Sequence, residues 1–222
     1  MLVKLTHPFL WRCKDPASLL ANLDKFNTFC SRLEKQAADL NPVDEKMSED
    51  EKKAQYDAIN KYKGDGFELF VEAMIRLFPC DKRLGLIEDY KNDDIRTDVG
   101  VDGHGISGYN QKPITVQVKY RQHDWKLTAN QDHLNNFVAA SLLGGKDGRY
   151  KVDQVPDSTT GKCNMIIITS GESLNFFTDH EMFDSMVYAF CRNDIRALVD
   201  NNPTFWKSFA ESWVESLKQA KA

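Results

Sequence analysis

An aspartate, a glutamine and a lysine stand in segments whose other residues are typical of a protein core. Asp102 ends the run Asp-Val-Gly-Val-Asp, and Gln117 and Lys119 alternate with valines between Pro113 and Tyr120. Because residues two apart in an extended strand share a face, Gln117 and Lys119 are expected to project together. If the chain at 99–102 pairs with this strand, Asp102 reaches the same polar patch.

Glu68 is a fourth polar residue on an otherwise apolar surface. It precedes Ile75 by nearly two helical turns, so its carboxylate is expected on the apolar side of a helix, together with Val71. An unpaired carboxylate there would cost several kcal/mol of desolvation. We therefore expect Glu68 to meet a lysine, a metal ion or water.

These side chains are suited to phosphodiester hydrolysis with a divalent cation. Oxygen ligands hold Mg²⁺, which neutralises phosphate charge and lowers the pKa of a bound water. A neighbouring lysine orients the attacking water or stabilises the developing negative charge. The residue types thus favour a metal-dependent site.

Three short motifs resemble the active-site pattern of the PD-(D/E)xK nuclease superfamily, most like its Mrr-type restriction endonuclease branch. They are Gly-Asp-Gly-Phe-Glu68, Asp98-Val-Gly-Val-Asp102-Gly and Gln117-Val-Lys119. The resemblance runs from about Gly64 to Ser170, roughly half of the chain. It implies an α/β fold with a restriction-endonuclease-like core, in which a mixed sheet is flanked by helices, with added N- and C-terminal helices.

The resemblance also implies roles for these residues. Asp102 would be the principal metal ligand, Gln117 would occupy the usual acidic position, and Glu68 would be the acid of the first helix. Lys119 would be the catalytic lysine, and Asp98 would have a supporting role. The implied cofactor is Mg²⁺, with Mn²⁺ as an alternative. Glutamine is a neutral and weaker ligand than glutamate, so the metal affinity and the number of ions stay open, although the Mrr-type branch often has glutamine there.

Each motif has an ordinary alternative when taken alone. Glu68 could be a surface acid beside Lys63, and Asp102 a turn residue before a glycine. Gln117 and Lys119 could form the solvent face of an edge strand. Their order along the chain, on elements of the expected kinds, favours the nuclease interpretation.

A basic segment extends from just before the predicted strand to beyond its end and is interleaved with aromatic residues. Its nucleic-acid-binding candidates are Lys112, Arg121, His123 and Lys126. Next to the catalytic lysine, such a segment favours contacts with DNA phosphates, and the alternative is a solvated strand end.

Gln131 has two interpretations. It resembles a helical glutamine near the site in related nucleases, and with Thr128 it also fits a capping box, which we favour.

Composition excludes several classes of protein. The 222 residues carry a formal net charge of −4, and no apolar run is long enough to span a membrane. The five cysteines form no CxxC pair, which favours reduced thiols and a cytoplasmic, intracellular location. The histidines lack zinc-ligand spacing. Gly161-Lys162-Cys163 lacks the residues of a phosphate-binding loop, so no nucleotide cofactor is expected.

Periodicity and turn residues predict the element order. Helices are expected from Asp15 through Leu33, after Gly64, from Thr128, from Thr178 through Phe190, and from Asn202-Pro203. Strands are expected at Leu84–Ile87, Arg96–Val101, Pro113–Tyr120 and Met165–Thr169, with loops at Gly103–Lys112 and Gly144–Lys162. The expected domains are an N-terminal helical region (1–60), a nuclease core (61–177) and C-terminal helices (178–222).

The sequence therefore predicts a Mg²⁺-dependent DNA endonuclease that nicks DNA or cuts both strands. Cutting both strands would favour a homodimer, because one such site cuts one strand at a time. Two alternatives stay open: a catalytically inactive nuclease fold that binds DNA or assembles with partners, and the nuclease part of a larger restriction or helicase machine.

Overall fold

The chain forms two compact units. The computed structural model describes residues 1–79, 81–93, 100–128, 134–144, 148, 150–156, 158, 161–174 and 186–220. A helical unit comprises residues 1–77 and 196–222, and a sheet unit comprises residues 78–195. These boundaries differ from the expected ones at 60/61 and 177/178. The first expected boundary falls inside a continuous helix, and the second lies outside the described residues.

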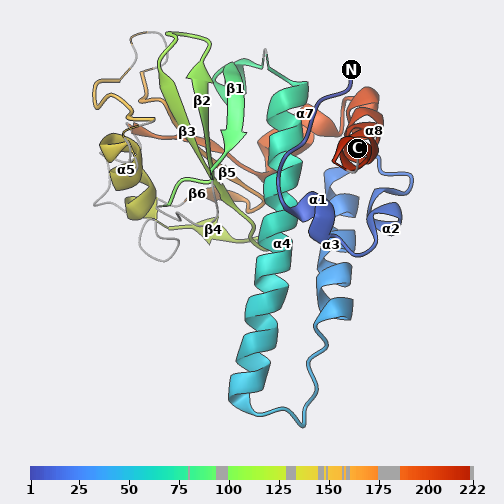
Figure 1. The fold of residues 1–222 in the computed structure, drawn as a ribbon. Coiled ribbons are helices and arrows are strands. Elements are labelled where there is room, and N and C mark those ends of the chain that lie inside the picture. The colour runs from blue at the N-terminus through green and yellow to red at the C-terminus, as the bar shows by residue number, and fades with distance from the viewer. Residues whose placement is uncertain are drawn as a thin grey trace. The chain divides into compact units, whose positions relative to one another are not determined.

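The helical unit contains the helices α1 (Phe9–Arg12), α2 (Pro16–Leu20), α3 (Phe26–Leu40), α4 (Glu49–Leu77) and α8 (Pro203–Gln219) (Figure 1). Asp15, where the first helix was expected to begin, caps α2, because its side chain accepts a hydrogen bond from the backbone N–H of Ser18. The single helix expected from Asp15 to Leu33 is two helices instead. Asn22 has a φ of +51°, a left-handed conformation that helical residues do not adopt.

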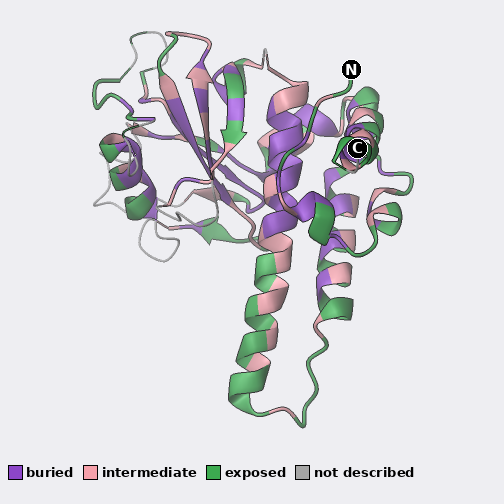
Figure 2. Ribbon diagram, viewed as in Figure 1, coloured by how far each residue is buried: buried purple, intermediate pink, exposed green. Residues whose placement is uncertain are grey.

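Helix α4 is longer than the sequence predicted. Its 29 residues begin just after a capping box, in which the backbone N–H of Ser48 donates to the Glu51 carboxylate and that of Glu51 donates to the Ser48 hydroxyl. The expected start at Gly64 is therefore wrong. Gly66 has a packing role: a Cβ there would lie 2.5 Å from Cδ1 of Leu33 on α3. Figure 2 shows that the N-terminal half of α4 is largely exposed, whereas its C-terminal half is buried.

Aromatic side chains fill the core of the helical unit. Phe70 of α4 stacks on Phe29 of α3, with ring centroids 5.0 Å apart, and meets Phe209 of α8 edge-on. Trp206 and Trp213 of α8 are buried as well. The predicted start of this helix at Asn202-Pro203 is thus confirmed.

The sheet unit is a mixed α/β structure around a five-stranded sheet of order β1-β2-β3-β5-β7. Its strands are β1 (Ile87–Asn92), β2 (Gly103–Ser107), β3 (Pro113–Lys119), β5 (Met165–Thr169) and β7 (Tyr188–Phe190). The pairs β1/β2 and β2/β3 are antiparallel, and β3/β5 and β5/β7 are parallel. The smaller pair β4 (Lys126–Leu127) and β6 (Ser173–Leu174) is also parallel. The predicted strands β3 and β5 are confirmed.

Strand β2 occupies the stretch that was expected to be a glycine-rich loop. A Cβ at Gly103 would lie 2.2 Å from the hydroxyl of Tyr90, and one at Gly105 would lie 2.6 Å from the carbonyl oxygen of Glu88. The glycines therefore let β1 approach closely, so this part of the loop prediction is wrong. Residues 96–99 of the expected strand before it lie outside the described residues.

Two further expectations are corrected. Leu84 belongs to the 3₁₀ turn η1 (Lys82–Leu84), and β1 begins only at Ile87. Phe190, expected in a helix, lies in β7, because pairing with β5 overrides its helical spacing from Met186. Helix α7 (Arg192–Val199) was not expected.

Helix α5 (Leu134–Leu143) covers one face of the sheet. Its residues Leu134 and Phe137 join a buried cluster with Met165 and Ile167 of β5. A hydrogen bond of 2.8 Å links the hydroxyls of Thr115 on β3 and Ser141 on α5. Gln117 and Lys119 share this face with Thr115, because side chains two apart in a strand project to the same side. The described residues of the polar segment 144–162 form no helix or strand.

The described cysteines form no disulfide bonds, which agrees with the expected reduced thiols. Cys13, Cys30, Cys163 and Cys191 are free and buried. Burial raises the pKa of the Cys191 thiol to about 11, and the charge of Asp194 adds to this. Cys80 lies outside the described residues. Within the described part of the chain, no helix is both long and apolar enough to cross a membrane.

Candidate active site

The structure brings Asp102 and Gln117 into contact. The backbone N–H of Asp102 donates to the carbonyl oxygen of Val116 at 3.0 Å, so Asp102 enters the ladder just before β2. Its Oδ2 accepts hydrogen bonds from the side-chain amide of Gln117 and from the backbone N–H of Val118. The carboxylate of Asp102 is thereby held against the central strand, as the predicted pairing requires.

Gln117 lies on the central strand of the sheet and is only 2% exposed. Strand β3 is flanked by β2 and β5, so the interpretation of Gln117 and Lys119 as the face of an edge strand is wrong. Gln117 pairs with Ile167 and Lys119 with Thr169 in the β3/β5 register. Lys119 therefore follows Gln117 on the same face, at the C-terminal end of the strand.

A hydrogen-bond network fixes the chain where β3 ends. The hydroxyl of Thr169 donates to the carbonyl oxygen of Lys119 at 2.9 Å. The buried hydroxyl of Ser170 accepts from the N–H of Arg121 at 2.7 Å and donates to its carbonyl oxygen at 2.8 Å. A guanidinium N–H of Arg192 donates in turn to the carbonyl oxygen of Ser170. The segment from Lys119 to Arg121 is thus held in place by β5 and the residues after it.

Sequence reasoning missed Thr169, Ser170 and Arg192. The signal available was position: Thr169 and Ser170 are the first polar residues after the apolar run of β5, at the edge where β3 ends. Arg192 gave no comparable signal, because its pairing with Ser170 joins segments that are separated along the chain.

Glu68 belongs to the helical unit, where its carboxylate contacts a histidine. Its Oε2 lies 2.9 Å from Nε2 of His7, rather than beside a lysine. The side chain is 26% exposed, although its neighbours Phe67 and Leu69 are buried. Asp102, Gln117 and Lys119 belong to the sheet unit, so membership of Glu68 in the site stays a prediction.

The basic residues divide between the two ends of β3. Arg121, His123 and Lys126 follow its C-terminal end, and the latter two are exposed. Lys112 precedes its N-terminal end, about 20 Å from Lys119 at the usual rise of a strand, and forms an ion pair of 2.7 Å with Asp153. It does not adjoin Lys119, and its contact with DNA stays a prediction. Asp98 and Gln131 lie outside the described residues, so neither interpretation of Gln131 is tested.

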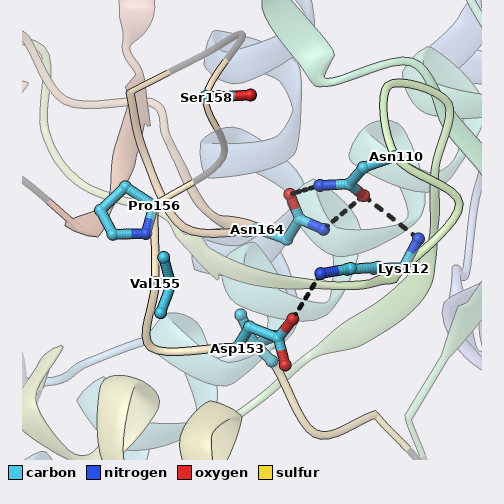
Figure 3. Close-up of a pocket in the computed structure, with 8 residues that line it drawn as sticks. Asn110, Lys112, Asp153, Val155, Pro156, Ser158 and Asn164 are labelled. Carbon is cyan, nitrogen blue, oxygen red and sulfur yellow. Dashed lines mark hydrogen bonds and ion pairs between the residues drawn. The ribbon is translucent and has the colours of Figure 1, made fainter.

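A hollow of about 250 Å³ lies near the N-terminal end of β3 (Figure 3). Asn110 and Asn164 hydrogen-bond to each other across it, and the Lys112–Asp153 ion pair closes one side. Val155 and Pro156 add apolar surface. The two amides and the two charged groups of this hollow are therefore paired with each other.

The Asp102–Gln117 contact also bears on the Mg²⁺ that the resemblance implies. Mg²⁺ prefers oxygen ligands, and the Asp102 carboxylate and the Gln117 side-chain carbonyl are both of this type. The nitrogen of the Gln117 amide now faces Asp102. A half-turn of the amide would present its oxygen instead, and a cation would hold the two oxygens together. The pair therefore fits a divalent cation by ligand chemistry, while the described residues contain no group of three His, Cys, Asp or Glu side chains placed to bind one.

No protein-family model, curated protein or solved structure matches the chain. The functional assignment therefore rests on the residues and their geometry.

Proposed function

We propose that this protein is a Mg²⁺-dependent DNA endonuclease with a restriction-endonuclease-like core. The observation that carries the proposal is the contact between Asp102 and Gln117 at the centre of the sheet, with Lys119 next on the same face. Placing an acid, an amide and a lysine among buried strands opposes folding, because polar groups lose hydration there. Such an arrangement is typical of a site that binds a charged substrate.

Each residue would have a separate role in hydrolysis. Asp102 and Gln117 would hold Mg²⁺, and Glu68 is the further ligand that the resemblance implies. Bound Mg²⁺ supplies neutralisation of phosphate charge and a more acidic water. Lys119 would orient the attacking water or donate hydrogen bonds to the phosphate as negative charge develops on it.

Arg121, His123 and Lys126 would extend the contact with DNA beyond the cleaved bond. Cationic side chains that follow the strand end are suited to phosphate oxygens, which fix the position of DNA without reading its sequence. The network through Ser170 would keep Arg121 in register with Lys119. Binding should therefore weaken steeply as salt is raised.

Metal-dependent cleavage of plasmid DNA tests the proposal. Supercoiled plasmid should become nicked or linear with Mg²⁺ or Mn²⁺ and stay intact with EDTA. A preparation of Asp102→Asn, purified identically, controls for a contaminating nuclease. Absence of cleavage with every metal, or cleavage that resists EDTA, would contradict the proposal. Linear product formed without a nicked intermediate would indicate two sites acting together, and hence a homodimer.

The amide of Gln117 favours one alternative, a catalytically inactive DNA-binding module. A glutamine that donates to Asp102 completes the contact without a cation. Such a module should retain DNA in a salt-sensitive manner, bind equally well with Mg²⁺ or EDTA, and cut no substrate. A gel-shift titration run beside the plasmid assay distinguishes the two functions.

A further inference from the structure

The N-terminal segment of the chain is attached to two helices of the helical unit. The backbone N–H groups of Val3 and Leu5 donate to the hydroxyls of Ser212 and Ser216 on α8, at 3.1 and 2.9 Å. These serines lie one helical turn apart. Side chains of α8 therefore take the place of a neighbouring strand for this extended segment.

The next two residues are held by a carboxylate of α4. Glu72 is fully buried and accepts from the backbone N–H groups of Thr6 and His7 and from the hydroxyl of Thr6. Arg76 balances its charge through an Nε contact of 3.0 Å. The backbone at His7 is thereby fixed against α4.

The hydrogen bonds of the His7 ring define its tautomer. The ring is buried, and its Nδ1 accepts a hydrogen bond of 3.2 Å from the backbone N–H of Phe9. An accepting nitrogen carries no proton, so the proton of the neutral ring lies on Nε2. That nitrogen is 2.9 Å from Oε2 of Glu68 and therefore donates to it.

Only one carboxylate oxygen of Glu68 is engaged in this way. Among the described residues, the structure shows no hydrogen bond or ion pair at Oε1. A half-buried carboxylate with one oxygen fixed by a rigid donor keeps a constant orientation and leaves its other oxygen for a further partner. Donors of this kind orient carboxylates that bind metal ions.

We propose that His7 is the positioning residue for Glu68, the helix acid that the resemblance assigns to the nuclease site. This proposal rests on the proposed function, because a fixed orientation of Glu68 affects cleavage only if Glu68 is a metal ligand of the nuclease. The competing role is purely structural, with His7 serving only to satisfy the N–H of Phe9 at the start of α1. The two roles use different ring nitrogens, so they can be separated by substitution.

Two amide substitutions separate these roles. The Nε2 of glutamine can take the place of the histidine Nε2, so His7→Gln keeps a donor to Glu68. The Oδ1 of asparagine can take the place of Nδ1, so His7→Asn keeps the acceptor for Phe9 and loses the contact with Glu68. We expect cleavage within about twofold of wild type for His7→Gln and about tenfold slower, with a higher Mg²⁺ requirement, for His7→Asn. Equal rates for the two variants, or a slower His7→Gln, would overturn the proposal.

A spectroscopic measurement tests the same contact without activity. Long-range ¹H–¹⁵N spectra report the tautomer of each ring, and the signal of His7 is assigned by its absence in His7→Gln. The wild-type ring should be protonated on Nε2, and Glu68→Gln should shift this signal. A ring protonated on Nδ1 would overturn the proposal. If the wild type cuts no DNA, the proposed function fails, whereas the tautomer still decides whether His7 holds Glu68.

Discussion

The two ends of β3 both carry a lysine, an acid and an amide, but these side chains are paired differently at each end. At the N-terminal end, Lys112 is paired with Asp153, and the amides of Asn110 and Asn164 are paired with each other. At the C-terminal end, the Asp102 carboxylate contacts the Gln117 amide, and among the described residues the Lys119 amino group forms no ion pair or hydrogen bond. The N-terminal end thus pairs its own charges, whereas the C-terminal end holds an acid against an amide, with Lys119 next on the same face of the strand.

The burial of the two ends differs in the same direction. Lys112 and Asp153 are each more than half exposed, so their ion pair contributes little to stability. Gln117, Thr169 and Ser170 are buried, so each of their hydrogen bonds matters more. Buried hydrogen bonds therefore fix the chain more firmly at the C-terminal end of β3, where the proposed chemistry occurs.

Removal of charge at each end should give the largest contrast. Asp102→Asn and Lys119→Met should each slow plasmid cleavage by about a thousandfold, because each removes a group that acts on the reacting phosphate. Asparagine can still accept from the N–H of Val118, so folding should be kept. The matched substitution at the other end, Asp153→Asn, should leave the cleavage rate unchanged. Initial rates of nicking, with circular dichroism as a check on folding, measure this. Comparable losses at both ends would remove the distinction between them.

Loss of the Ser170 hydroxyl should give the next largest effect. Ser170→Ala leaves both backbone groups of Arg121 without their partner, which should lower the free energy of unfolding by about 1–3 kcal/mol. Because Ser170 holds the chain just after Lys119, its substitution should also displace Lys119 and slow cleavage by about tenfold or more. Urea denaturation and cleavage rates measure the two effects. Ser158→Ala, at an exposed serine beside the hollow, is the control and should change neither. Unchanged cleavage in a destabilised Ser170→Ala would show that the network serves the fold alone.

A second acid beside Asp102 should change the thermal stability in a way that depends on metal ions. Two carboxylates in contact repel each other without a cation, so Gln117→Glu should lower the melting temperature in EDTA. Mg²⁺ should reverse this loss and reach half-saturation of cleavage at a concentration about tenfold lower than in wild type. Thermal melts with EDTA, Mg²⁺ and Ca²⁺ measure the first effect, and metal titrations of cleavage measure the second. Failure of Mg²⁺ to raise the melting temperature would argue against a cation between Asp102 and Gln117.

The sequence predicted those parts of the site that depend on local periodicity. The alternation around Gln117 and Lys119 placed both residues on one face of a strand, and the apolar run at Met165 indicated the buried strand beside it. The Asn202-Pro203 pair marked the start of α8. These features depend on residues close together in the chain.

Other features depend on contacts between distant segments and could not be predicted. The glycines of β2 indicated a loop, since nothing local shows that Tyr90 needs the space beside Gly103. The contact of Glu68 with His7 joins residues 61 positions apart, and the spacing on α4 gave no sign of a histidine partner. Phe190 had helical spacing, yet it pairs in a strand because β5 offers it an edge.

The smallest effect expected concerns binding of DNA by the two basic groups near the ends of β3. Arg121→Gln should weaken binding a few-fold and lower the slope of log affinity against log salt by about one, as expected for loss of one phosphate contact. Lys112→Gln should leave this slope nearly unchanged, because Asp153 already neutralises that lysine. Fluorescence anisotropy across a series of salt concentrations, with Ca²⁺ in place of Mg²⁺ to prevent cleavage, measures both slopes. A larger change for Lys112→Gln would indicate that DNA passes near the hollow at the N-terminal end of β3. It would also show that the Lys112–Asp153 ion pair opens when DNA binds.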